Sequence, residues 1–155
     1  MNDILSTADR RDALAVLILR VGLIWFLFLW AIHKILATSQ YQNLARNFDD
    51  VEISATTVQL IGAAQIVVLF LALIGIFRPF AYGAMAAAHA FTVSRQWERY
   101  IDPFAISERG FPVNRNVSVS AAVMCAFIVL LLLIHRDHYS IGGWLKRKWE
   151  DAWWL

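Results

Sequence analysis

The sequence predicts an all-α integral membrane protein, a four-helix transmembrane bundle followed by a C-terminal amphipathic interfacial helix. Of the 155 residues, 59% are hydrophobic and 17% are charged, whereas soluble domains average about 45–50% and about 25%. The apolar residues stand in blocks: Asp, Glu, Lys and Arg are absent from 53–77, 79–94 and 116–134, and 13–33 contains only Arg20. Each block is close to the roughly 20 residues that cross a hydrocarbon core of about 30 Å. The chain, 1–155, is therefore expected to form a single transmembrane domain.

The first helix is expected over about residues 13–36, after a short polar segment. Arg10 and Arg11 precede the apolar run, as basic residues do in a signal peptide. The run then continues to His33 and Lys34, whereas a signal peptide has a short apolar core and a small-residue cleavage site. We therefore interpret this segment as a retained membrane helix.

Two further helices follow a polar loop at 38–56. The second is expected over about 57–77, with Thr56 or Thr57 as its cap. The Arg78-Pro79 step leaves only a tight connection, so the second and third helices should be antiparallel neighbours. The third, about 80–97, is rich in Gly and Ala, which let helices approach closely in lipid, and is expected at the centre of the bundle.

The last part of the chain is expected to contain a mixed loop at 98–115, a fourth helix at about 116–134 and an amphipathic tail at about 141–155. Apolar tail residues recur at helical spacing, namely Ile141, Trp144, Leu145, Trp149 and Trp153. Such a helix lies well in a headgroup layer, and packing on a partner protein is the alternative. Lys and Arg are nearly balanced between the two sides, and the basic cluster at 146–148 favours both termini in the cytoplasm.

Composition excludes several classes of function. The net charge is +2 and the Lys and Arg residues are scattered, so no nucleic-acid partner is expected. The single cysteine, Cys125, lies inside an apolar block, which excludes a disulfide framework and a thiolate metal cluster. His135 and His138 flank Asp137, but third and fourth ligands are lacking, so no metal site is expected.

Polar side chains within the apolar helices are costly in a bilayer and suggest a function by default. At about 1.5 Å per residue, the expected helices place Gln65 and His89 together at middle depth, opening toward His33, Lys34 and Arg95. His89 is either a hydrogen-bond donor or proton carrier for a quinone, or a bundle histidine bonded to a neighbouring helix. Gln65 and Thr92 are plausible partners in both cases.

Arg20 is the one other ionisable residue inside the first apolar block. Arg20 is expected to form an ion pair with Asp137, or else to hold an anionic headgroup or a ligand.

A haem bound by two histidines is also considered, since its two axial histidines must lie at one depth. His33 lies near one surface, His89 is central, and His135 and His138 are on the other side, so no haem is expected.

Several of these segments together resemble the DoxX family of small bacterial four-helix membrane proteins. The first helix contains LRVGL at 19–23 and WAIHKIL at 30–36, similar to the family's opening pattern of an early Arg and a closing Lys. After the fourth helix, HYSI at 138–141 followed by Trp144 and Leu145 is similar to the family's closing stretch, and Asn114 or Asn116 also fits.

The resemblance implies a subunit of a quinone-linked oxidoreductase in the bacterial inner (plasma) membrane, working beside partner subunits. Nothing in the chain is expected to hold a flavin, haem or iron–sulfur cluster, so electrons would arrive from a partner. The candidate catalytic residue is His89, and the candidate quinone-binding residues are Gln65, His89, Arg95, His33 and Trp30. The alternative is a non-catalytic membrane anchor or structural subunit of a larger respiratory or redox complex. A transporter is the third possibility, although the chain lacks the internal repeats that transporters usually carry.

Overall fold

The computed structural model describes residues 6–107, 110–112, 114 and 116–149, and this part of the chain is helical. The elements are α1 (Thr7–Leu36), α2 (Thr38–Asp49), α3 (Ala55–Ile74), α4 (Arg78–Ser94), α5 (Glu98–Ile101), α6 (Asn116–Leu132), a 3₁₀ turn η1 (Ile134–Arg136), and α7 (Ile141–Lys148). Within those ranges there is no strand, only an isolated bridge between Ile106 and Pro112. The expected all-α class is confirmed.

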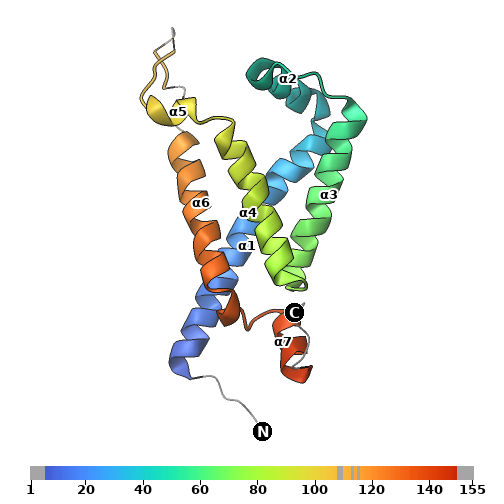
Figure 1. The fold of residues 1–155 in the computed structure, drawn as a ribbon, viewed down its shortest axis with the longest axis vertical. Helices are drawn as coiled ribbons and strands as arrows, with labels where there is room; N and C mark the ends of the chain where they lie inside the picture. The colour runs from blue at the N-terminus through green and yellow to red at the C-terminus, as the bar shows by residue number, and fades with distance from the viewer. Residues whose placement is uncertain (1–5, 108–109, 113, 115, 150–155) are drawn as a thin grey trace.

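The four long helices α1, α3, α4 and α6 pack against one another, while α2 and α7 lie at opposite ends (Figure 1). The most extensive contact joins α1 to α3, and α4 packs on both α6 and α3. The start of α1 and the whole of α7 lie at the same end (Figure 1). The core between these helices is apolar and includes Val16, Leu23, Leu69, Met85, Phe127 and Leu130.

Two of the helices, α1 and α3, are long and apolar enough to cross a membrane, and residues Val117–Leu132 form a shorter apolar helix. The outward faces are also apolar. Large hydrophobic side chains that are at least 60% exposed occur on all four long helices, including Ile18, Trp25, Val67, Phe70, Phe80, Phe91 and Leu132. Four crossings remain a prediction.

Helix ends differ from the expected ones where capping residues set them. α1 begins at Thr7 rather than 13, because the Ser6 hydroxyl oxygen accepts a hydrogen bond from the Asp9 backbone N–H. Ser54, not Thr56 or Thr57, caps α3. α3 then ends at Ile74 because Gly75 adopts a left-handed conformation, with φ of 72°. The tight turn from α3 into α4 is confirmed.

The expectation of a loop at 38–56 is wrong, because its first part forms α2. The Thr38 hydroxyl donates to the Lys34 carbonyl at 2.8 Å, and the Gln42 side chain donates to the Ile53 carbonyl at 2.7 Å. Ala45 is buried, and the Lys34 ammonium group lies 4.8 Å from the centre of the Tyr41 ring. These tertiary contacts stabilise α2, although its polar composition predicted a loop. The expected loop at 98–115 likewise contains the short helix α5.

Gly83 of the third predicted helix does not lie at a close helix–helix contact, whereas Gly62 of α3 does. A Cβ added at Gly62 of α3 would lie 2.9 Å from the Ala31 carbonyl oxygen of α1, whereas one added at Gly83 of α4 would meet nothing within 4 Å. α1 is the helix that contacts α2, α3, α6 and η1. The centre of the bundle is therefore α1, and the α1–α3 pair depends on Gly62.

Candidate functional site

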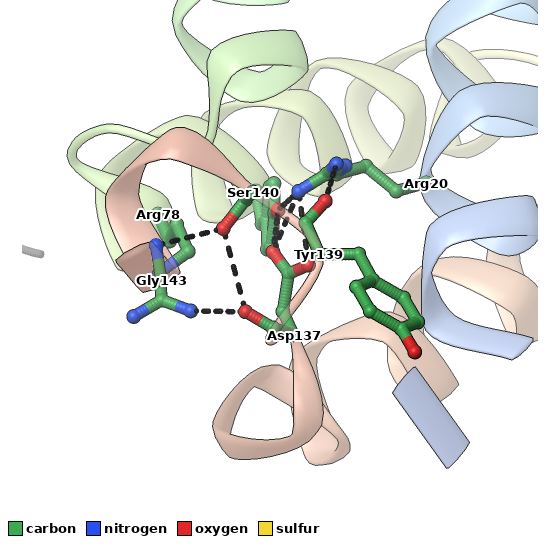
Figure 2. Close-up of polar contacts among 7 residues, drawn as sticks. Arg20, Arg78, Asp137, Tyr139, Ser140 and Gly143 are labelled. Atoms are coloured by element: carbon green, nitrogen blue, oxygen red, sulfur yellow. Dashed lines mark hydrogen bonds and ion pairs between the residues drawn. The ribbon is translucent and has the colours of Figure 1, made fainter. Parts of the chain in front are cut away.

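A buried polar cluster lies at the end of the bundle where α7 packs. Arg20 Nη1 lies 2.9 Å from each carboxylate oxygen of Asp137, and the Tyr82 hydroxyl donates to Asp137 Oδ2 at 2.6 Å. Arg20 Nη2 donates to the Tyr139 carbonyl at 2.8 Å (Figure 2). Arg20 is 2% exposed and Asp137 is fully buried. The predicted Arg20–Asp137 ion pair is confirmed.

Sequence reasoning missed two members of this cluster, Arg78 and Tyr82. Arg78 Nη1 donates to the Asp137 backbone carbonyl at 2.8 Å (Figure 2), and Arg78 is 6% exposed. A signal was present, because residues four apart share one face of a helix and both precede the middle of α4. The cluster thus joins α1, the start of α4 and the segment after α6.

The Ser140 cap of α7 and the glycines Gly142 and Gly143 position the chain after α6 against this cluster. The Gly143 backbone N–H donates to Ser140 Oγ at 2.9 Å, and Ser140 Oγ donates to the Asp137 carbonyl at 3.4 Å (Figure 2). A Cβ added at Gly142 would lie 1.7 Å from the Gly75 carbonyl oxygen. Gly142 therefore lets α7 pack directly on the α3–α4 turn.

The described part of the predicted tail helix ends at Lys148. Trp144 and Trp149 are half-exposed, and the Lys148 ammonium group lies 5.9 Å from each of their rings. Trp153 lies outside the described residues. The helix docks through its glycines, and its indole rings remain at the surface.

His89, the candidate catalytic residue, is buried between α4, α1 and α6. Its Nε2 lies 3.0 Å from the backbone carbonyl of Ser120, and its ring centre lies 5.9 Å from that of Phe26 and 5.6 Å from that of Phe127. A carbonyl only accepts hydrogen bonds, so Nε2 carries the hydrogen and Nδ1 has the lone pair when the ring is neutral. This contact selects one tautomer of His89.

The structure does not bring Gln65 to His89. In the described part of the chain, no hydrogen bond or ring contact joins them, and Gln65 Oε1 is buried without a partner. α3 packs mainly on α1 and separates from α4 with distance from their connecting turn (Figure 1). The Thr92 hydroxyl donates to Ala88 in its own helix, so neither expected partner binds His89.

The other candidate quinone-binding residues lie toward the α2 end. His33 Nε2 lies 3.1 Å from Gln40 Oε1 of α2, and the Trp30 ring contacts the His33 ring edge-on at 6.3 Å. Arg95 is exposed, and its guanidinium carbon lies 5.4 Å from the Phe91 ring centre. Trp30 and His33 form one contact, and Arg95 lies apart from it at the end of α4.

Comparison with known proteins adds no assignment to this geometry. Among the described residues, no group of three or more His, Cys, Asp or Glu side chains is placed to hold a metal ion. No family model matches the chain, and neither a curated protein nor a solved structure matches it.

Proposed function

We propose that the chain is an integral membrane protein in which α1, α3, α4 and α6 each cross the bilayer of the bacterial inner membrane. The exposed apolar side chains on all four helices support this, because soluble monomers rarely expose apolar patches beyond a few hundred Å². α4 and α6 each have 17 residues, about 25 Å of helix, which a thin or locally thinned hydrocarbon core accommodates. The polar helix α2 and the amphipathic helix α7 would lie at the two membrane surfaces, with both termini cytoplasmic.

Cysteine labelling in intact cells tests this topology. The background is Cys125→Ser, and single cysteines are introduced as Asp12→Cys, Asn43→Cys and Asp102→Cys, all at exposed positions. A membrane-impermeant maleimide is expected to label the second and third variants in intact cells and the first only after cell disruption. Labelling of Asn43→Cys and Asp102→Cys from opposite sides would contradict four crossings.

Within this arrangement, we propose that the chain is the quinone-interacting subunit of a membrane oxidoreductase and that His89 exchanges a proton with the quinol. The observation that carries the proposal is the tautomer of His89. With Nε2–H bonded to Ser120, the Nδ1 lone pair is the group that can accept a quinol hydroxyl proton. Phe26 and Phe127 give this ring an aromatic setting suited to a flat apolar ligand.

The remaining candidate contacts would hold the quinone, and a partner subunit would carry the electrons. Gln65 has a buried amide oxygen without a partner, which a ligand hydroxyl could satisfy. Trp30, His33 and Arg95 lie toward the α2 end and would contact the quinone, or its reduced and more anionic form, as it moves to or from His89. This chain's own part is to bind the ring and to move the proton at His89 Nδ1.

The quinone content of protein purified in mild detergent tests the proposal. Wild type and His135→Leu, an exposed-histidine control, are expected to retain near-stoichiometric quinone, and His89→Leu is expected to lose it. His89→Gln keeps an N–H for the Ser120 carbonyl but has no proton-accepting nitrogen, so it should bind quinone and fail in quinol oxidation by the assembled complex. Equal quinone in wild type and His89→Leu would place the site elsewhere.

A second candidate function is a non-catalytic anchor for a larger enzyme, supported by the segment that follows α4. Ile101, Phe104, Ile106 and Phe111 are each about 70% exposed or more, at the end of the bundle opposite α7. Side chains of this kind form the apolar centre of protein–protein interfaces. If wild-type protein retains no quinone but co-purifies with a partner that Phe104→Ser releases, the anchor becomes the function.

A further inference from the structure

A groove lies beside the polar cluster, between the end of α3 and the start of α7. Its volume is about 370 Å³, and its apolar walls are Leu73, Ile74, Ile141 and Trp144. Arg20, Tyr139 and Ser140 line its polar side. The groove is open to the surface rather than enclosed, and its lining is mostly apolar with a few polar groups, as in small-molecule sites.

Arg20 has one hydrogen-bond donor that the cluster does not use. Nη1 and Nη2 are bonded to Asp137 and to the Tyr139 carbonyl. Nε is buried and has no partner in the part of the chain that the structure describes, although Arg20 is only 2% exposed. A buried N–H without an acceptor is costly, and this one belongs to a side chain that lines the groove.

The number of unused donors and the lining indicate what kind of acceptor fits. Arg20 offers one unused N–H beside apolar walls, which suits a single carbonyl oxygen, whereas an anion such as phosphate is bound by several donors together. The Ser140 hydroxyl is committed to Gly143 and to the Asp137 carbonyl. The groove therefore offers one hydrogen bond and four apolar walls.

We propose that this groove binds an apolar molecule through a carbonyl oxygen that accepts a hydrogen bond from Arg20 Nε. The ring carbonyl of a quinone and the ester carbonyl of a phospholipid share this chemistry. The site is separate from His89, which lies seven residues beyond Tyr82 on α4, about 10 Å along the helix. It does not depend on the proposed role of His89.

Native mass spectrometry of the detergent-purified full chain tests the groove. Ile141→Trp fills it, and Ile18→Trp is the matched control, since both isoleucines are more than half exposed but only Ile141 lines the groove. The protein is exchanged into ester-linked or ether-linked phosphatidylcholine, with or without decylubiquinone. One bound molecule is expected on wild type and Ile18→Trp, with roughly tenfold less on Ile141→Trp, the effect of losing one hydrogen bond and its apolar contacts.

The lipid and quinone arms identify the source of the carbonyl. Retention of decylubiquinone over lipid identifies a quinone, and retention of the ester lipid but not the ether lipid identifies a phospholipid. Arg20→Lys keeps a cation beside Asp137 but lacks Nε–H, so it should lose the preference for the ester lipid or the quinone. A wild type that retains no molecule, or equal amounts of both lipids and no quinone, overturns the proposal.

The same measurements separate this groove from the proposed His89 site. Loss of decylubiquinone in Ile141→Trp with retention in His89→Leu supports the groove and contradicts the His89 proposal. Loss in His89→Leu alone, with ester-lipid preference intact, supports the proposed function and identifies the groove ligand as phospholipid.

Discussion

Replacing Asp137 with asparagine should destabilise the fold more than any other single change of similar size. Asp137 is fully buried, and its two oxygens accept hydrogen bonds from Arg20 and Tyr82. The asparagine amide would turn one acceptor into an N–H₂ group facing donors and leave the Arg20 charge buried without a counter-ion. Breaking one partner of a buried ion pair costs about 3–5 kcal/mol, a factor of roughly 150 to 5,000 in the unfolding equilibrium.

The free energy of unfolding is measured by circular dichroism in mixed micelles of dodecylmaltoside and sodium dodecylsulfate. The control is Glu52→Gln, which removes the exposed ion pair between Arg46 and Glu52 at 3.4 Å. That pair should contribute less than about 1 kcal/mol. The double variant Arg20→Leu with Asp137→Leu should lose less than the sum of the losses in the single variants Arg20→Leu and Asp137→Leu, because it removes both members of the ion pair together.

Two results would refute this reasoning. Equal destabilisation by Asp137→Asn and Glu52→Gln would show that the cluster does not hold the bundle together. A double variant whose loss equals the sum of the two single losses would show that Arg20 and Asp137 act independently.

The remaining predictions concern the glycines. Gly142→Ala should displace α7 because its Cβ would collide with the Gly75 carbonyl, and faster amide exchange in α7 with unchanged exchange in α3 would show it. Gly62→Ala should lower the free energy of unfolding by about 1–3 kcal/mol, since its Cβ overpacks against Ala31. Gly83→Ala meets open space and should stabilise α4 by up to about 1 kcal/mol. A Gly62→Ala variant as stable as Gly83→Ala would contradict the close α1–α3 approach.

The apolar blocks were enough to place the long helices because each block encodes one helix. Their ends were less predictable, since Ser6 and Ser54 extend the helices into polar sequence. α2 was missed because its stability comes from contacts such as Gln42 with the Ile53 carbonyl, which composition does not record. Tyr41 and Ala45, four residues apart on one face, were the available signal.

For the polar residues, the sequence predicts how far along the bundle each one lies better than it predicts which neighbour its side chain contacts. Arg20 and Asp137 were paired correctly because depth along the bundle and opposite charge leave few choices. Gln65 and His89 were expected at one depth, yet the structure does not join them, because α3 packs mainly on α1 and separates from α4 away from their connecting turn. His89 contacts Phe26 and Phe127 instead, and hydrophobic periodicity does not predict which neighbour each helix packs on.

The order in which the chain is synthesised gives the Arg20–Asp137 pair another consequence. Arg20 leaves the ribosome 117 residues before Asp137. Its guanidinium therefore lacks the Asp137 counter-ion until α6 and the residues after it have been synthesised. A nascent chain that stops before residue 137 would keep an uncompensated cation among apolar helices. We expect such truncated chains to be less stable than the full chain, so the residue that follows η1 completes the packing of a helix made at the start of synthesis.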